Sequence, residues 1–328
     1  MMSGFLLTYR YYYNSDFVEC SIKKNYKWAT KKLKNLWCLH IITTFMTIPF
    51  TYVNNGLLNQ FVVMIYANCL MIQEWLPFRQ SGMLNGGVSW YLCTVLFTYF
   101  VFPWILQYLR RSGTIVKARL SIVLLVFIQI SIGLVGKNMD TNDYIWNWLE
   151  NNWCHWFLYR FPLSRSIEFL LGVNIAYLVI NKDDELTMES VSIRKIKYSI
   201  LEICSVVSVM VAIGISYYFR NNYWTGLSEQ WWTHSIIYVL PNICVIYIFS
   251  QEKGIFSHKL GSCRFVKYVS EQSTYAFLIH YVVFKYVNIF LDCRLTDSEN
   301  RELYFILIGT VITFGCTFVY KQLAERAR

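Results

Sequence analysis

Long apolar segments recur along almost the whole chain, separated by short polar stretches. A helix rises about 1.5 Å per residue, so roughly 20 mainly apolar residues cross about 30 Å of hydrocarbon. The pattern predicts about eight or nine membrane segments, at 36–54, 57–74, 88–109, 120–136, 161–180, 199–219, 233–250, 270–291 and 303–320. We therefore expect an all-α, polytopic bundle of transmembrane helices that forms a single domain over residues 1–328.

The composition supports a surface that faces lipid. Hydrophobic residues make up 55% of the chain and charged residues 15%, whereas soluble domains carry roughly 25% charged residues. The 12 Trp, 25 Tyr and 23 Phe suit aromatic belts at membrane interfaces. The sequence lacks the short alternating segments of an outer-membrane barrel. We expect a multi-pass protein of the cell membrane.

Basic residues gather in a few polar stretches. The net charge is +10 at pH 7, and Lys and Arg cluster within 10–35, 110–119, 194–197 and 253–267. Cytoplasmic loops of membrane proteins carry an excess of Lys and Arg. We therefore place these stretches and the C-terminal tail in the cytoplasm, in contact with membrane lipid, and we expect no nucleic-acid partner.

The segment at 57–74 conflicts with simple alternation across the membrane. Segments 36–54 and 57–74 both lie between a cytoplasmic stretch and an external one, so one of them cannot cross. Polar residues and turn formers interrupt the later segment and its continuation, namely Asn59, Gln60, Asn68, Gln73, Glu74, Pro77, Gly86 and Gly87. Irregular backbone occurs at membrane depth only where protein or a watery cavity satisfies it. We predict that 57–87 is re-entrant or interfacial.

The cysteines and short motifs exclude several functions. The ten cysteines form no CxxC pair and stand beside no histidine-rich cluster, so we expect no metal site. The chain contains no Walker A motif, GxSxG elbow, HExxH motif or dinucleotide-binding glycine fingerprint. Nucleotide-driven transport and metalloprotease activity therefore lose support.

Ionisable side chains within apolar segments are costly, and each one is by default a functional hypothesis. The candidates are His40, Arg165, Glu168, Glu202, His234, His280 and Lys285. Arg165 and Glu168 stand three residues apart, so they share one helix face and can form an ion pair. Such a pair either pins two helices together or contacts a substrate.

Among the histidines, His280 is a candidate for catalysis because it lies in the middle of segment 270–291. A neutral imidazole there can act as a base or donate a hydrogen bond, although a histidine that only satisfies the bundle is favoured. His40 and His234 lie near segment ends without a carboxylate at helical spacing, and we interpret both as structural. The residues alone leave the catalytic group unknown.

Three lysines before segment 36–54 permit two interpretations. Lys31, Lys32 and Lys34 can hold this stretch at anionic lipid on the inner side of the membrane. They can also bind a ligand rich in phosphate. The residues alone favour the lipid interpretation.

Five stretches, taken in order, resemble the integral-membrane acyltransferase-3 family. They are 3–7 (SGFLL), the basic stretch running into 36–41 (LWCLHI), 86–92 (GGVSWYL), 161–172 (FPLSRSIEFLLG) and 273–280 (STYAFLIH). The family's basic loop usually carries two arginines three apart before a proline, where this chain has Lys32 and Asn35 before Cys38. Lys31 and Lys34 flank that position and compensate for the missing charge.

The resemblance implies a membrane O-acyltransferase that modifies surface polysaccharides or other extracytoplasmic hydroxyl acceptors. It implies that acyl-CoA, acetyl-CoA above all, is the donor on the cytoplasmic side, with Lys31, Lys32 and Lys34 near its phosphates. It also implies an acceptor hydroxyl reached from outside, near Trp90, Arg165 and Glu168.

The N-terminus leads to a further expectation and to two alternatives. Residues 3–7 resemble the end of the family's second helix, so we expect the first helix, with the family's catalytic histidine, and part of the second helix to be missing. One alternative function is transport of a glycan or lipid, because many spans with buried charges also suit a translocation path. The other alternative is an inactive, truncated remnant.

Overall fold

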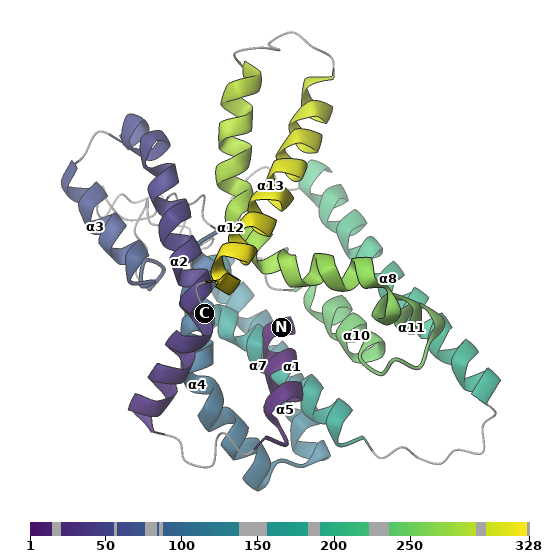
Figure 1. The fold of residues 1–328 in the computed structure, drawn as a ribbon. Coiled ribbons are helices and arrows are strands. Elements are labelled where there is room, and N and C mark those ends of the chain that lie inside the picture. The colour runs from purple at the N-terminus through teal and green to yellow at the C-terminus, as the bar shows by residue number, and fades with distance from the viewer. Residues whose placement is uncertain are drawn as a thin grey trace. The chain divides into compact units, whose positions relative to one another are not determined.

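The computed structural model describes residues 1–14, 21–55, 58–75, 84, 88–137, 156–182, 191–222, 236–292 and 300–326. Within these ranges every regular element is a helix (Figure 1), which confirms the all-α fold. Contacts divide the chain into two compact units. Unit 1 comprises Met1–Trp28 with Phe97–Cys263, and unit 2 comprises Ala29–Leu96 with Arg264–Arg328.

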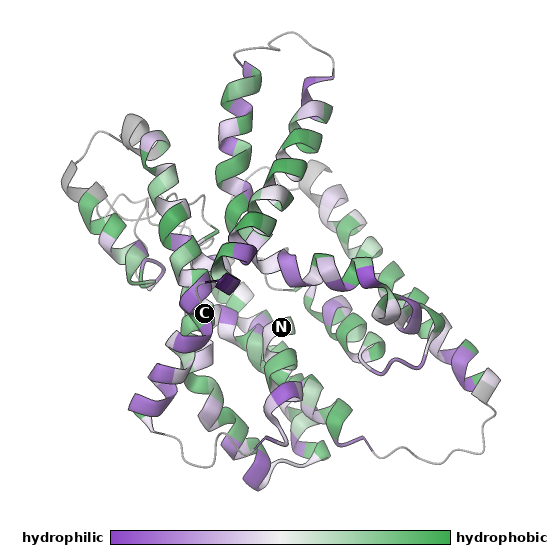
Figure 2. Ribbon diagram, in the orientation of Figure 1, coloured by the Kyte–Doolittle hydropathy of each residue, from purple (hydrophilic) through white to green (hydrophobic). Residues whose placement is uncertain are grey.

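Six helices of the described residues are long and apolar enough to cross a membrane. They cover Trp90–Ser112, Ile115–Val135, Trp156–Ile180, Ser192–Tyr218, Arg264–Asp292 and Arg301–Arg326. All six overlap predicted segments, and Figure 2 shows long hydrophobic runs along them. The polytopic membrane architecture follows from these helices.

The other three predicted segments have a different form. Segment 36–54 is part of the longer helix α2, Ile22–Asn55. Segment 57–74 contains the 12-residue α3, Leu58–Cys69, and 233–250 contains the 11-residue α10, Val239–Phe249. At about 1.5 Å per residue neither short helix spans roughly 30 Å of hydrocarbon. Residues 76–83 and 85–87 of the expected re-entrant stretch lie outside the described residues.

The clustered charge suggested that the lysine-rich stretch before segment 36–54 is a loop. Part of it is helical instead. Helix α2 begins at Ile22, so Lys31, Lys32 and Lys34 stand on a helix. Lysine, alanine and leucine favour helices, and no glycine or proline occurs between residues 21 and 35. These propensities extend the helix beyond its apolar part.

Helix α7, Pro162–Ile180, lies at the centre of unit 1. Residues 171–177 are all buried, and α7 packs most extensively against three other helices of this unit. These are α1 (Met2–Tyr11), α5 (Ile115–Lys137) and α10. Unit 1 also contains the π-helical turn η3 (Trp156–Arg160), α8 (Val191–Asn222), α11 (Ile255–Ser262) and α4 (Trp90–Ser112) from Phe97 onward.

Two glycines allow the backbones of α1 and α7 to touch. A Cβ atom on Gly172 would lie 1.9 Å from the carbonyl oxygen of Met1. A Cβ atom on Gly4 would lie 2.2 Å from the carbonyl oxygen of Phe169. Small residues at helix crossings permit this close approach, which drives helix association in membranes.

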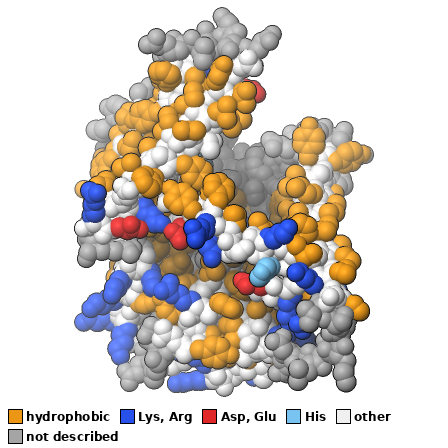
Figure 3. Space-filling view, turned by 45° about the vertical axis from the view of Figure 1, so that its right-hand side comes forward, with side chains coloured by type: hydrophobic (Ala, Val, Ile, Leu, Met, Phe, Trp, Pro, Cys, Tyr) orange, Lys and Arg blue, Asp and Glu red, His pale blue; other side chains and the backbone are white. Residues whose placement is uncertain are grey.

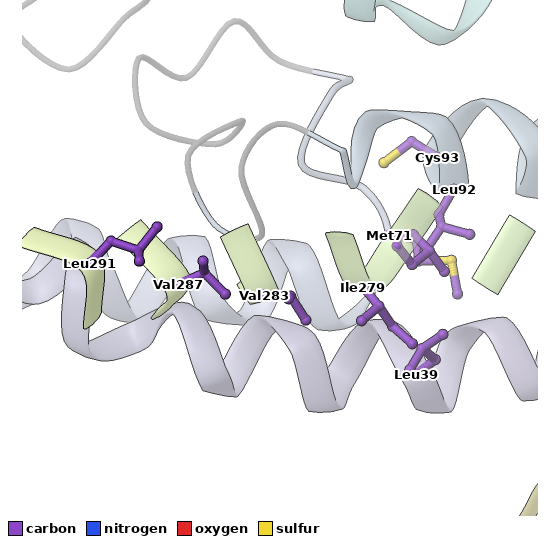
Figure 4. Close-up of a cluster of buried hydrophobic side chains, with 9 residues drawn as sticks. Leu39, Met71, Leu92, Cys93, Ile279, Val283, Val287 and Leu291 are labelled. Carbon is purple, nitrogen blue, oxygen red and sulfur yellow. The ribbon is translucent and has the colours of Figure 1, made fainter. Parts of the chain in front are cut away.

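In unit 2, the helices α12 (Arg264–Asp292) and α13 (Arg301–Arg326) pack against each other. Figure 4 shows side chains of α12 at a spacing of four residues along one face beside α2, namely Ile279, Val283, Val287 and Leu291. They form a buried cluster with side chains of α2, α3's end and the start of α4, comprising Leu39, Met71, Leu92, Cys93, Leu278, Ile279, Val283, Val287 and Leu291.

Exposed apolar side chains cover much of the outer surface. Figure 3 shows broad hydrophobic areas, with Lys and Arg side chains gathered between and below them. On α5, Val123, Leu124 and Phe127 are all more than half exposed. Such a surface is stable against lipid rather than water.

Candidate active site

Three exposed lysines mark one end of unit 2. Lys31, Lys32 and Lys34 stand on α2. The hydroxyl of Tyr320 on α13 donates to the backbone carbonyl of Asn35, with 2.5 Å between the oxygens. This bond holds the C-terminal part of α13 beside the turn of α2 that carries the lysines.

Helix α12 joins the same end of the unit. Lys321 Nζ lies 2.7 Å from Glu271 Oε2, and the rings of Tyr275 and Tyr320 have centroids 5.8 Å apart. Three helices therefore meet where the lysines stand. We refer to Lys31, Lys32, Lys34, Tyr320 and Lys321 as the lysine end.

Trp90 also belongs to unit 2. It is the first residue of α4 and is 9% exposed, and its ring contacts that of Tyr91 edge-on at 6.2 Å between centroids. The next two residues, Leu92 and Cys93, pack in the cluster that contains Leu39. The start of α4 is thus fixed beside the middle of α2.

Arg165 and Glu168 lie in unit 1, near the beginning of α7. Arg165 Nη1 is 2.5 Å from Glu168 Oε1, so the structure contains the ion pair that their spacing predicts. The guanidinium carbon of Arg165 lies 5.4 Å from the ring centroid of Tyr159. The side chains are 14% and 23% exposed. A partly exposed pair of this kind can bind a polar group of a substrate.

One face of α2 carries buried polar side chains. His40, Thr43, Thr44 and Thr47 are spaced at three and four residues and are all at most 2% exposed. The apolar side chains between them point outward, namely Ile42, Phe45 and Met46. The polar face of α2 therefore lies inside unit 2, the reverse of a helix in a soluble protein.

Two side chains of α2 cap the end of α3. His40 Nε2 lies 2.9 Å from the carbonyl oxygen of Asn68, and Trp37 Nε1 donates to the carbonyl of Cys69 at 2.8 Å. Helix α3 ends in a Schellman motif, because Met71 has a positive φ of 55° and its N–H donates to Asn68. Trp37 thus satisfies a carbonyl group that the helix end leaves open, and His40 adds a second hydrogen bond to the Asn68 carbonyl.

The contact with Asn68 determines the tautomer of His40. A carbonyl oxygen only accepts hydrogen bonds, so Nε2 carries the proton and Nδ1 presents its lone pair. Thr44 Oγ1 lies 3.5 Å from Nδ1, at the outer limit of a hydrogen bond. In the neutral ring, Nδ1 therefore carries a lone pair that is at most weakly engaged.

Asn68 and Gln73, at and just after the end of α3, carry side-chain oxygens that can accept hydrogen bonds. The amide of Asn68 donates to the carbonyl of Met64, and that of Gln73 donates to the carbonyl of Ser89. Asn68 Oδ1 and Gln73 Oε1 accept no hydrogen bond from any described residue, although both side chains are fully buried. Each of these oxygens, like His40 Nδ1, therefore has unused capacity to accept a hydrogen bond. We refer to His40, Asn68 and Gln73 as the buried polar group.

The comparisons with known proteins agree with the resemblance in the sequence. A family model described as an acyltransferase domain matches residues 1–321. The chain belongs to the acyltransferase-3 family. Comparisons with curated proteins and with solved structures give no match. The family and the six apolar helices make the protein a membrane acyltransferase, and transport is not favoured.

The other ionisable candidates of this acyltransferase have local partners. His280 Nδ1 lies 2.7 Å from the carbonyl oxygen of Phe277, and its ring lies near those of Phe277 and Phe284. Lys285 Nζ lies 5.5 Å from the ring centroid of Tyr281 on the same helix. His234 lies outside the described residues.

Glu202 on α8 caps another helix of unit 1. Its Oε2 accepts the N–H of Phe256 at 3.0 Å, and its Oε1 accepts the N–H of Ser257 at 3.2 Å. A Cβ atom on Gly254 would lie 2.2 Å from this carboxylate, so glycine makes room for it. The buried charge thus stabilises the N-terminus of α11, where a carboxylate is favoured.

The sequence contained a signal for the buried polar group that its interpretation passed over. The helical spacing of His40, Thr43, Thr44 and Thr47 in an apolar segment predicts one polar face. His40 was interpreted as structural because no carboxylate stands at helical spacing from it. Its partner is a backbone carbonyl 28 residues away, which spacing within one helix does not reveal. No three His, Cys, Asp or Glu residues in the described ranges lie close enough to hold a metal ion.

Proposed function

We propose that this acyltransferase transfers an acyl group, acetyl in the simplest case, from acyl-CoA to a hydroxyl of an extracytoplasmic carbohydrate such as a surface polysaccharide. The family supplies the reaction class. The lysine end is the observation that carries the choice of donor, because it gathers exposed ammonium groups on a rigid junction of three helices.

The chemistry of CoA fits this end of unit 2. Its phosphates are anionic, and lysine ammonium groups bind phosphate as point charges. Lys31, Lys32 and Lys34 stand within one turn of α2, where Tyr320 holds α13 against the backbone. A fixed turn with three cations can hold the phosphates while the thioester extends along the helix.

The choice of acceptor-binding residues follows from the groups that a sugar presents, namely hydroxyls and the faces of its rings. Trp90 is an aromatic side chain of the kind that stacks on sugar rings, although it is 9% exposed in this structure. The Arg165–Glu168 pair offers both donors and acceptors for sugar hydroxyls. We propose a role in acceptor recognition for the Arg165–Glu168 pair of unit 1 and, separately, for Trp90 of unit 2.

The donor assignment is tested by reversing charge at the lysine end. We expect the double substitution Lys32→Glu and Lys34→Glu to lower the affinity for acetyl-CoA about tenfold or more, because it places carboxylates near the phosphates. Binding is measured by isothermal titration on purified protein in lipid nanodiscs. Folding should change little, since exposed charges contribute little to stability.

The matched control reverses two exposed lysines of unit 1, Lys195 on α8 and Lys259 on α11. The net charge changes equally in both double variants, so a general electrostatic effect would weaken CoA binding in both. Equal affinities of the two variants for acetyl-CoA would show that the lysine end does not bind the donor.

A further inference from the structure

We propose that unit 1 holds the headgroup of an anionic phospholipid at a cluster formed by Lys182, Tyr198, Tyr247, Gln251 and Lys253, with an acyl chain of that lipid along α10. We refer to these five residues as the lysine–tyrosine cluster. Such a site goes beyond the general attraction of basic stretches to anionic membranes. It does not depend on the donor or the acceptor proposed above.

The cluster lies where apolar helices of unit 1 begin or end. Lys182 stands two residues after the end of α7, and Gln251 stands two residues after the end of α10. Tyr198 lies near the start of α8, which has 32 residues and is about 48 Å long. Because the hydrocarbon is only about 30 Å thick, part of α8 projects beyond it. The cluster therefore lies at a boundary between hydrocarbon and water, where lipid headgroups are found.

Three uncharged side chains hold the ammonium group of Lys182. Its Nζ donates to Gln251 Oε1 at 2.8 Å and to the hydroxyl of Tyr198 at 3.3 Å, and it lies 5.8 Å from the ring centroid of Tyr247. The Tyr198 hydroxyl also donates to Gln251 Oε1, at 3.2 Å. Among the described residues, no carboxylate pairs with Lys182. Its charge is thus fixed in position by neutral groups.

A second lysine brings another positive charge to the same ring. The Nζ of Lys253 lies 5.7 Å from the ring centroid of Tyr198, and the Nζ of Lys182 lies 5.9 Å from it. Two like charges held beside one ring repel each other, and an anion between them lowers that repulsion. Lysine ammonium groups bind phosphate as point charges. Lys182 is exposed and Lys253 is partly exposed, so a headgroup can reach both.

Helix α10 favours a lipid over a free phosphate. Leu240, Cys244 and Tyr247 are spaced at four and three residues, so they share one face of this helix. Tyr247 contacts Lys182, whereas Leu240 is 58% exposed and Cys244 is also exposed. The face that carries the cluster therefore continues as an exposed apolar surface. A phospholipid uses both parts of this face, because its acyl chains begin next to its phosphate. Inorganic phosphate uses only the cations, and in acyl-CoA the pantetheine arm separates the acyl group from the phosphates.

The experiment counts lipids bound to the purified full chain by native mass spectrometry while phosphatidylglycerol or phosphatidylcholine is added. We expect the wild type to bind one phosphatidylglycerol about tenfold or more tightly than phosphatidylcholine, whose choline ammonium is repelled by the lysines. The double substitution Lys182→Gln and Lys253→Gln removes both charges but keeps N–H donors. It should weaken phosphatidylglycerol binding about tenfold or more, with little change in the melting temperature measured without added lipid.

Two further double variants separate a site from general attraction. Lys195→Gln with Lys259→Gln removes two exposed lysines from α8 and α11 and changes the net charge equally. It should keep its affinity for phosphatidylglycerol within about twofold of the wild type. Lys182→Arg with Lys253→Arg retains both charges and should also keep that affinity. An equal loss in the cluster variant and in the Lys195–Lys259 variant would overturn the proposal.

Two measurements on the wild type alone decide the proposal even where the glutamine variant does not fold. Equal binding of the two lipids would show that the headgroup charge is not recognised, and would overturn it. Excess inorganic phosphate and excess CoA are also added to the complex with phosphatidylglycerol, and we expect neither to displace the lipid. Displacement by phosphate would show a site for free phosphate, and displacement by CoA alone would show a donor site, so either result would exclude a lipid site.

Discussion

Two buried polar places in the molecule contrast in how their hydrogen bonds are used. At the α8–α11 junction of unit 1, both oxygens of Glu202 accept backbone N–H groups. After α3 in unit 2, Asn68 and Gln73 keep side-chain oxygens that no described residue fills. Glu202 carries a charge in an apolar helix, yet its bonding is that of a helix cap. Open hydrogen-bonding capacity is therefore a better guide to chemistry here than buried charge.

The ion pair Arg165–Glu168 stands between these two cases. Each partner satisfies the other at 2.5 Å, but neither side chain is fully buried. The pair can stabilise α7 and still exchange partners with a substrate. Glu202, the Arg165–Glu168 pair and Gln73 should therefore differ in how much each contributes to stability and how much to acyl transfer. Substitutions can measure both contributions.

The largest effect on stability is expected at Glu202. Glu202→Ala leaves the N–H groups of Phe256 and Ser257 without their partners, and hydrogen bonds to charged groups contribute about 1.5–3 kcal/mol each. We expect a loss of about 3 kcal/mol, measured by thermal unfolding in nanodiscs. The turnover number per folded molecule should stay at the wild-type value. A stable Glu202→Ala variant with reduced turnover would contradict this, because it would show that Glu202 serves catalysis and not the stability of α11.

An intermediate effect is expected at the ion pair. Arg165→Ala and Glu168→Ala should each lower acyl transfer, and the double variant should lose less than the sum of the two, with a coupling of about 1 kcal/mol. Initial rates and melting temperatures of the four proteins complete the double-mutant cycle. Strict additivity in both quantities would show that the two residues act separately.

The smallest effect on stability is expected at Gln73. Gln73→Met removes a buried oxygen that accepts no hydrogen bond, which is stabilising, and the hydrogen bond to the Ser89 carbonyl, which is destabilising. The free energy of unfolding should therefore change by less than about 1 kcal/mol. Acyl transfer should fall about tenfold if Oε1 holds the acceptor hydroxyl. Gln129→Met on α5 is the matched control, because that buried side chain also has an unfilled oxygen but lies in unit 1. Equal rates in the two variants would separate Gln73 from catalysis.

The sequence predicted the membrane helices better than it predicted the polar contacts. Hydropathy over 18 or more residues averages many side chains, so the six long apolar helices were recognisable. The Arg165–Glu168 pair was also predictable, because its spacing within one helix determines the contact. Contacts between helices depend on packing, and neither Glu202 with α11 nor His40 with α3 leaves a local pattern.

The lysine-rich stretch shows a different reason for a wrong prediction. Charge was taken to mark a loop, but lysine favours helices and no breaker separates Ile22 from the apolar part of α2. The placement of this stretch in the cytoplasm stays a prediction, as do the roles of Trp90 and His280. For His280, the bond to the Phe277 carbonyl shows its surroundings without testing its role.

The glycine crossing of α1 and α7 has a consequence for the order of events during synthesis. Helix α1 has ten residues, about 15 Å in length, and its close backbone contact is with a helix that the ribosome makes roughly 150 residues later. At about 5–20 residues per second, that interval is roughly 8–30 s. During this time α1 has no α7 to dock against. A Cβ atom at Gly172 would block that late docking step, so we expect substitution there to disturb the assembly of unit 1.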